Sequence, residues 1–78
     1  MNELTMNLKT DSKVPLYEQI YNYIKSDIQN GRISYGEKLP STRALARHLE
    51  ISRSTAELAY EQLLSEGYIE SEPCRGYL

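Results

Sequence analysis

The sequence predicts a small α+β domain in which three helices are followed by a C-terminal β-hairpin. Apolar residues recur with the period of a helix from Pro15 to about Asn30, and two serines, Ser41 and Ser52, each precede a shorter segment with the same period. After Gly67 the pattern changes to the alternation of a strand, and a turn sequence follows. These three observations together give the order helix, helix, helix, hairpin.

The composition is that of one globular domain. The chain has 78 residues, of which 40% are hydrophobic and 26% are charged. A domain near this size buries only about 60% of the surface of its unfolded chain, which leaves little room for a deep substrate cavity beside the core. Residues 1–13 show no sustained period, so we expect them to form a flexible N-terminal arm and residues 14–78 to form the domain.

The sequence argues against several classes of protein. No apolar run approaches the roughly 20 residues that span a membrane, and the N-terminus lacks the layout of a secretory signal, so we expect a soluble cytoplasmic protein. The single cysteine, Cys74, and the single histidine, His48, provide neither an internal disulfide nor a zinc site. They lie on different elements without a phosphate-binding loop nearby, so we expect no catalytic residue, no metal and no cofactor in this chain.

The first predicted helix carries a broad apolar face. Pro15 suits its first turn because that position needs no N–H donor, and Gly31 favours the left-handed conformation that ends a helix. At about 100° per residue, the apolar side chains share one arc and the polar side chains the other. We expect the apolar arc to be buried; it consists of Leu16, Tyr17, Ile20, Tyr21, Tyr23, Ile24 and Ile28.

The second and third predicted helices are short and follow each other closely. Ser41 and Ser52 cap their first turns, and we expect the third helix to span residues 52–66. Only two residues separate Leu49, at the end of the second helix, from Ser52, so the helices must cross at a steep angle. Leu58 lies nearly opposite the inward side of the third helix and has no explanation in the sequence. That inward side is Ala56, Ala59, Tyr60 and Leu63.

The end of the chain predicts a small hairpin. Residues 68–71 alternate as a strand, residues 73–76 are typical of a turn, and residues 77–78 begin a second strand. A short extended segment, residues 38–39, precedes the second helix. With two steeply crossing helices before it, this hairpin predicts a three-helix winged helix-turn-helix in which the hairpin is the wing.

Charge is unevenly distributed along the chain. The formal net charge of the whole chain is −2, which by itself counts against nucleic acid as a partner. Residues 38–56, however, carry +3, and the rest of the chain carries −5. A partner meets the local field rather than the total, so the two short helices remain compatible with a polyanion. The bases of this segment are Lys38, Arg43, Arg47 and Arg53.

The first turn of the third helix has side chains that suit the reading of base edges. Three short hydroxyl side chains, Ser52, Ser54 and Thr55, surround Arg53. A helix fits the major groove of DNA, and arginine can bridge O6 and N7 of guanine. Arg43, near the start of the second helix, can reach the flanking backbone or a base. The plainer alternative is that Ser52 only caps the helix and Arg53 is solvated.

The spacing around Ala46 favours the DNA-binding interpretation. Helix-turn-helix units place apolar residues in a fixed pattern around a small residue of their first helix. That pattern is filled here by Leu45, Leu49, Ile51, Ala56 and Ala59. With the hairpin behind the third helix, Arg75 and Gly76 are expected along the neighbouring minor groove, although Arg75 can equally be an exposed turn charge.

Four segments together resemble the N-terminal DNA-binding domain of GntR-type bacterial transcription regulators. They read VPLYEQI at 14–20, GEKLPSTRALA at 36–46, SRST at 52–55 and EGYI at 66–69. The order of several linked motifs makes the resemblance specific, and it covers about residues 14–78. The segment AELAYEQLL at 56–64 is most similar to the MocR branch, whose members join this domain to an aminotransferase-like domain that binds pyridoxal phosphate.

The resemblance implies sequence-specific binding of double-stranded operator DNA. It places the third helix, residues 52–66, in the major groove and the hairpin wing on the flanking minor groove. The DNA-binding residues that it implies are Arg43, Ser52, Arg53, Ser54, Thr55, Arg75 and Gly76. Weaker candidates for contacts with the DNA backbone are Tyr17, Lys38 and Ser41.

Three positions depart from the family pattern. Glu50 stands in the turn between the two short helices, where many relatives have glycine, and in a left-handed conformation a side chain there costs roughly 1 kcal/mol. Glu57 stands where other branches carry arginine, and Cys74 stands where glycine is usual in the wing.

The resemblance also implies what a full-length regulator adds. It implies a homodimer and a C-terminal domain, absent from this chain, that binds a small-molecule effector; pyridoxal phosphate belongs to that domain in the MocR branch. A short helical effector domain is the alternative within the family. An alternative of another class is a winged-helix module that binds protein rather than DNA. The −5 charge outside the basic segment favours it, as do the acidic residues Glu57, Glu61 and Glu66.

Overall fold

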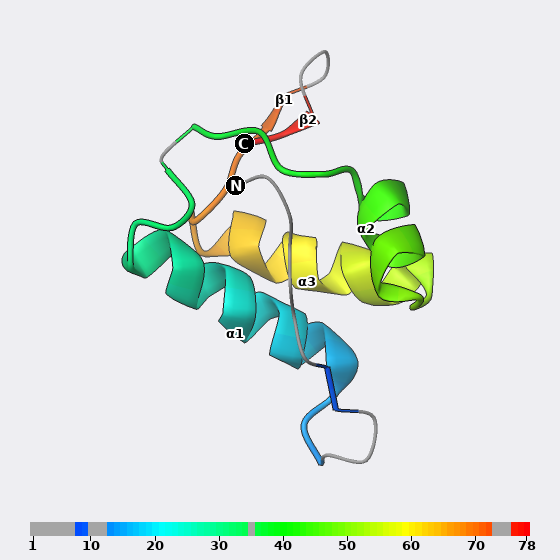
Figure 1. Cartoon of the computed structure of the whole chain (residues 1–78). Helices are drawn as coiled ribbons and strands as arrows, with labels where there is room; N and C mark the ends of the chain where they lie inside the picture. Colours follow the sequence, from blue (N-terminus) through cyan, green and yellow to red (C-terminus); the bar gives the residue numbers. More distant parts are fainter. Residues whose placement is uncertain (1–7, 10–12, 35, 73–75) are drawn as a thin grey trace.

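Three helices and one two-stranded antiparallel sheet make up the fold (Figure 1). The computed structural model describes residues 8–9, 13–34, 36–72 and 76–78. In chain order the elements are α1 (Leu16–Gln29), α2 (Thr42–Leu49), α3 (Arg53–Ser65), β1 (Ser71–Glu72) and β2 (Gly76–Tyr77). The predicted α+β class and order of elements are confirmed.

The core forms around α3, against which both α1 and α2 pack. In Figure 1, α1 runs alongside α3 and α2 lies across its N-terminal end. The predicted inward side of α3 is fully confirmed, since Ala56, Ala59, Tyr60 and Leu63 are all buried. Of the predicted apolar arc of α1, Ile20, Tyr21 and Ile24 are buried and the other four side chains are half-buried. The loops and α2 complete the core with Ile33, Leu39, Leu45, Ala46 and Ile69.

All three helices end in the same hydrogen-bonded turn. In this motif one residue takes the left-handed conformation, and its own N–H and that of the following residue donate to carbonyls of the last turn. Gly31 and Gly67 occupy the left-handed position after α1 and α3, with φ of +78° and +79°. After α2 the same position is held by Glu50, with φ of 57° and ψ of 46°. The predicted glycine ends are therefore confirmed, and Glu50 adopts the conformation in which its side chain is costly.

The hairpin begins later than predicted. β1 pairs with β2 through Ser71↔Tyr77 and Glu72↔Gly76, and the backbones of Glu70 and Leu78 exchange two hydrogen bonds of 2.7 and 2.8 Å. The predicted strand at 68–71 is wrong at its start, because the N–H of Tyr68 donates to the carbonyl of Leu63 at 3.0 Å and so closes α3 instead. The second strand begins one residue earlier than predicted. The predicted turn residues 73–75, Cys74 and Arg75 included, lie outside the described residues.

The extended segment before α2 is joined to the wing. The N–H of Leu39 donates to the carbonyl of Tyr77 at 2.8 Å, so the backbone at 39 runs beside β2. Leu39 itself is buried. This bond ties the position of the wing to the start of α2, which follows Leu39 by only a few residues.

The described part of the N-terminal segment contacts α1. Leu8 is half-buried against the core. The side-chain amide of Gln19 accepts from the N–H of Lys9 at 2.9 Å and donates to the carbonyls of Lys9 and Val14, at 2.9 and 2.8 Å. Residues 1–7 and 10–12 of the predicted arm lie outside the described residues. Among the helices of the described ranges, none combines the length and the apolar character needed to cross a membrane.

Candidate nucleic-acid interface

The two helices of the helix-turn-helix both begin at a serine cap, as predicted. The hydroxyl oxygen of Ser41 accepts a hydrogen bond from the N–H of Ala44 at 3.1 Å. That of Ser52 accepts from the N–H of Thr55 at 3.2 Å. These caps fix the first turns of α2 and α3, whose remaining free amides favour a negatively charged group.

The first turn of α3 presents a cluster of hydroxyl groups to solvent. The Oγ of Ser52 lies 2.7 Å from Oγ1 of Thr55 and 3.2 Å from Oγ of Ser54. Ser52 and Ser54 are exposed, and Thr55 is half-buried. Because a hydroxyl can both donate and accept, the cluster keeps hydrogen-bonding capacity that points outward. It can therefore read polar edges while Ser52 also serves as the cap.

Arg53 stands within this cluster and is free to leave its one described ion pair. Its Nε lies 3.7 Å from Oε2 of Glu57, one helical turn further on, and the two side chains are 58% and 50% exposed. A solvated pair at this spacing is worth only about 0.3–0.5 kcal/mol. A stronger partner, such as the edge of a guanine, can replace the carboxylate at little cost.

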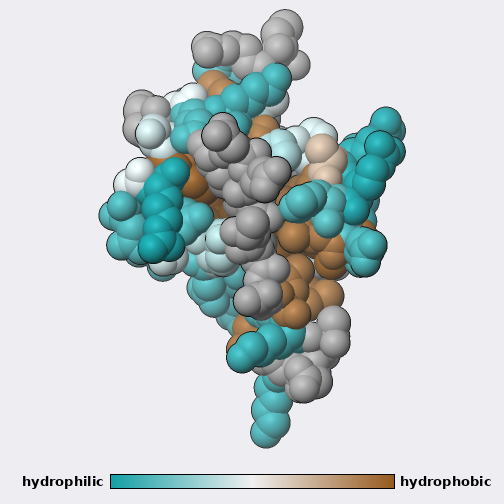
Figure 2. Space-filling view, viewed as in Figure 1, coloured by the Kyte–Doolittle hydropathy of each residue, from teal (hydrophilic) through white to brown (hydrophobic). Residues whose placement is uncertain are grey.

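The basic side chains of residues 38–56 all lie on the surface. Lys38, Arg43, Arg47 and Arg53 are exposed, and Arg43 stands in the first turn of α2. Figure 2 shows hydrophilic residues over the outer side of α2, with hydrophobic ones between α2 and α1. The local excess of positive charge that the sequence predicts is thus available to a polyanion.

The wing brings two of the predicted site residues together. Gly76 has φ of +79°, and a Cβ at that position would lie 3.9 Å from Cε of Lys38. The lysine of the segment before α2 therefore lies beside β2. Gly76 allows the left-handed backbone that a side chain would strain. Arg75, the other residue predicted for the wing, lies outside the described residues.

Two further residues predicted to contact the DNA backbone, Tyr17 and Ser41, are each partly engaged within the fold. Tyr17 is half-buried on α1 and packs against the core, which leaves only part of its side chain to solvent. The hydroxyl of Ser41 is already engaged as the cap of α2. The structure thus groups the first turn of α3 in one place and Lys38 with Gly76 in another, whereas Tyr17 belongs to a third element.

A shallow hollow between α3 and the wing was not predicted from the sequence. It is lined by Ser54, Glu57, Leu58, Glu61 and Tyr77. The four helical residues follow a spacing of three and four, which places them on one face of α3. That spacing is the signal by which the sequence could have marked this face, and the residue that stands out in it is Leu58, 49% exposed.

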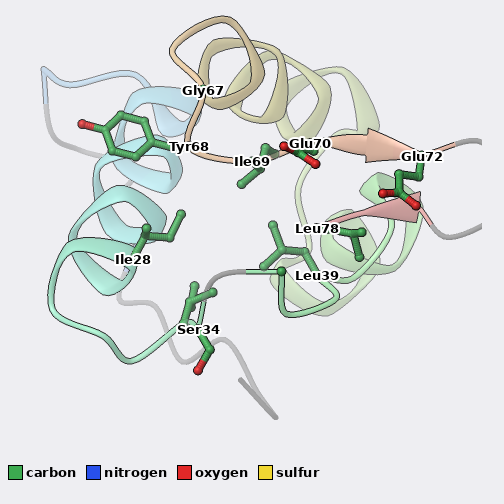
Figure 3. Close-up of a pocket in the computed structure, with 11 residues that line it drawn as sticks. Ile28, Ser34, Leu39, Gly67, Tyr68, Ile69, Glu70, Glu72 and Leu78 are labelled. Atoms are coloured by element: carbon green, nitrogen blue, oxygen red, sulfur yellow. The ribbon is translucent and has the colours of Figure 1, made fainter.

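A second pocket, of about 300 Å³, lies between the end of α1 and the wing. Figure 3 shows Leu39, Ile69 and Leu78 gathered in it, with Ile28 of α1 facing them. Its rim carries glutamates, and no basic side chain among the described residues lines it, so it does not suit a phosphate. Nor does the described part of the chain bring three or more His, Cys, Asp or Glu side chains together as metal ligands.

The comparisons with known proteins agree with this geometry. Residues 16–78 match the model of the family described as "Bacterial regulatory proteins, gntR family". The HTH-type transcriptional regulator YdeL of Bacillus subtilis is 49% identical over 75 residues, which are 96% of this chain and 16% of that protein. The probable rhizopine catabolism regulatory protein MocR of Rhizobium meliloti is 38% identical over 69 residues, 88% of this chain and 14% of that protein. The chain thus spans less than a fifth of the length of either relative.

Solved structures give the same result. YtrA from Sulfolobus acidocaldarius, a GntR-family transcription factor, superposes with a TM-score of 0.86 at 38% identity, over 91% of this chain and 74% of that one. A GntR family transcriptional regulator from Listeria monocytogenes superposes with a TM-score of 0.78 at 36% identity, over 86% of this chain and 59% of that one. The chain belongs to the GntR family of bacterial regulatory proteins, and its fold is the DNA-binding winged helix-turn-helix domain of these transcriptional regulators.

Proposed function

We propose that this domain binds operator DNA sequence-specifically, with α3 in the major groove and the wing at the flanking minor groove. The observation that carries the proposal is the first turn of α3. There an exposed arginine stands among hydroxyl groups, at a helix N-terminus, in the segment of the chain where positive charge is concentrated. Such a turn combines direct reading of base edges with attraction to phosphate.

Different residues make the contacts with base edges and with the DNA backbone. Arg53, Ser54 and Thr55 contact base edges, with Ser52 holding the turn as its cap. Arg43 in the first turn of α2 reaches the flanking backbone or a base. Contacts around the wing come from Gly76 and Arg75, and weaker contacts with the backbone come from Lys38, Ser41 and Tyr17.

A second copy of the domain would supply the DNA-binding surface that one copy lacks. A single domain of this kind buries only about 600–1,000 Å² of protein surface on DNA, so two copies on a two-fold or tandem site bind far more tightly than one. We therefore infer a homodimer whose further domain senses a small-molecule effector, within the cytoplasm and without catalysis by the present domain.

The MocR branch is the variant of this inference that the sequence favours. The 38% identity to MocR and the segment at 56–64 support it. In that branch pyridoxal phosphate belongs to the further domain. The apolar pocket between the end of α1 and the wing does not suit its phosphate, because glutamates line the rim and no described basic side chain lines it.

The test measures affinity against salt for two kinds of DNA. Duplexes are first selected from a randomised library by the 78-residue chain, and scrambled duplexes of the same composition serve as the comparison. We expect a preference for the selected duplex, and log K should fall linearly with log salt, each phosphate contact adding about 0.9 to the slope. Equal binding of selected and scrambled duplexes at every salt concentration contradicts specific recognition.

A matched pair of variants tests which arginine contacts a phosphate of the DNA. Arg43→Gln should reduce the salt slope by about 1, because it removes one phosphate contact. Arg32→Gln removes the same charge from the end of α1, where Arg32 pairs with Asp27 at 3.6 Å, and should leave the slope unchanged once folding is verified by thermal unfolding. Equal slopes for both variants would mean that Arg43 makes no phosphate contact. A wild-type chain that binds neither kind of duplex would support the protein-binding alternative, which the exposed acids Glu57 and Glu61 on α3 favour.

A further inference from the structure

Leu58 is an apolar side chain on the outside of α3, away from the core. It is 49% exposed, and with Val14 it is one of two large hydrophobic side chains that the structure describes as exposed. A single leucine on a surface is common and by itself indicates nothing. What distinguishes Leu58 is its position on α3 rather than its exposure.

Leu58 continues the surface that begins in the first turn of α3. It follows Ser54 by four residues and so lies on the same face of the helix, one turn further along. The hollow that the two residues share is also lined by Tyr77 of β2. Leu58 thus stands between the hydroxyl cluster and the wing, within the face of α3 that the proposed function turns toward the major groove.

We propose that Leu58 packs against the 5-methyl group of a thymine and so specifies one base pair of the operator. The inference rests on the proposed function and deepens it. The C5-methyl of thymine is the apolar group that a base pair presents in the major groove, and apolar side chains read it by contact. Leu58 follows Ser54 by four residues, a rise of about 6 Å along the helix. With α3 lying along the groove, the thymine is about two base-pair steps from the base that Ser54 reaches.

The charges around Leu58 favour a base edge over the DNA backbone. Glu57 and Glu61 flank it in the hollow, and both are exposed. Two carboxylates repel phosphates, so this part of α3 is poorly suited to lie against the backbone. A carboxylate can however accept a hydrogen bond from N4 of cytosine, and Glu57 becomes available for one when Arg53 leaves their 3.7 Å pair for a guanine. This face of α3 therefore suits the base edges on the floor of the major groove.

The test removes only the methyl group. In a duplex selected from a randomised library by the wild-type chain, each thymine is replaced in turn by deoxyuridine, and affinity is measured. We expect one replacement in each half-site to weaken binding about fourfold, the effect of losing one buried methyl-sized group. Leu58→Ala should weaken binding to the thymine duplex by a similar factor or more. The Leu58→Ala variant should bind the thymine duplex and the uracil duplex with equal affinity, because the two changes remove the same contact.

The control and the outcomes separate this inference from the function on which it rests. Val14→Ala truncates the other exposed apolar side chain, 38% exposed and outside α3, and should leave the thymine-to-uracil effect intact. Alanine at 58 keeps the helix, since it is the best helix former. If the chain selects a duplex but every uracil is tolerated, or the uracil effect persists in Leu58→Ala, then Leu58 does not read thymine. A chain that selects no duplex overturns both the function and the inference.

Discussion

The phenol oxygen of Tyr60 donates a hydrogen bond to the carbonyl oxygen of Pro40 over 2.7 Å. Tyr60 is 1% exposed, and its ring meets that of Tyr77 edge to face, with the centroids 4.7 Å apart. Burial raises the pKa of this phenol, so it remains a donor throughout the physiological range. One side chain of α3 thereby holds both the segment that leads into α2 and the second strand of the wing.

Tyr60→Phe tests how much that bond contributes. The substitution keeps the ring and leaves the carbonyl of Pro40 without this donor, so we expect the free energy of unfolding to fall by about 1–2 kcal/mol. In a domain of this size each kcal/mol lowers the melting temperature by roughly 4–8 °C. Urea and thermal unfolding measure both. Tyr17→Phe, at a half-buried position on α1, is the control and should change stability by less than about 0.5 kcal/mol. Equal stability of the two variants contradicts the role given to Tyr60.

Glu50→Gly should stabilise the domain. Glu50 holds the left-handed position after α2, with φ of 57°, where α1 and α3 have Gly31 and Gly67. A side chain costs about 1–2 kcal/mol there, and part of the gain from its removal is offset by the greater freedom of glycine in the unfolded chain. We expect a net gain of about 0.5–1 kcal/mol, measured by thermal unfolding.

The control for Glu50 separates backbone strain from charge. Glu50→Ala removes the carboxylate and keeps the Cβ, so it should not gain the stability of the glycine variant. Both variants remove a negative charge close to the basic helices, so both should bind DNA more tightly at low salt. If alanine stabilises as much as glycine, the charge and not the conformation is the cause.

The elements of the fold could be predicted because their signals are local. The serine caps at Ser41 and Ser52 and the glycine ends at Gly31 and Gly67 each depend on a few neighbouring residues, and the structure has them where the sequence indicates. The start of β1 was missed for a related reason. Tyr68 can either close the last turn of α3 or begin a strand, and in the structure its N–H bonds to the last turn of α3.

Contacts between distant parts of the chain left no such signal. Tyr60 and Pro40 are separated by 20 residues, and nothing in either segment marks the other. The same holds for Lys38 beside Gly76, which the structure places together in the wing. The face of α3 was predictable from helical spacing, as was the exposure of Arg53. The role of Leu58 was not predictable, because it depends on Tyr77 of the wing, which lines the same hollow.

A hydrogen bond between α1 and the end of α3 should make stability depend on pH. Tyr21 donates from its phenol to the carboxylate of Glu66, and this bond is the main cause that lowers the pKa of Glu66. A carboxyl whose pKa is lowered by folding contributes stability above its unfolded pKa of about 4.3, and loses that contribution as the pH falls through the folded value.

Tyr21→Phe is the variant that exposes this dependence. It removes the donor, so its deficit in unfolding free energy should be largest at neutral pH and should close as the solution is acidified below the ordinary glutamate pKa. Unfolding in urea at a series of pH values measures the difference. Tyr68→Phe is the control, since the phenol of Tyr68 has no bond to Glu66 among the described hydrogen bonds and its deficit should not vary over that range. If the loss of unfolding free energy in Tyr21→Phe is constant with pH, the hydrogen bond from Tyr21 is not what lowers the pKa of Glu66.

Arg53 is the residue on which specific recognition depends most directly. Its side chain is 58% exposed and its pair with Glu57 contributes little to folding, so Arg53→Ala should leave the unfolding free energy within about 0.5 kcal/mol of wild type. On a selected duplex the same change should cost about 1–3 kcal/mol of binding, because a bidentate contact with guanine is lost. Titrations with selected and scrambled duplexes measure the loss and its specificity.

Arg53→Lys distinguishes a base contact from a phosphate contact. Lysine keeps the charge but not the planar fork of the guanidinium, so it should retain binding to scrambled DNA and lose most of the preference for the selected duplex. If lysine preserves that preference, Arg53 holds the DNA backbone and the base edges are read by other side chains of α3. If alanine at 53 binds the selected duplex as tightly as arginine does, Arg53 lies outside the interface.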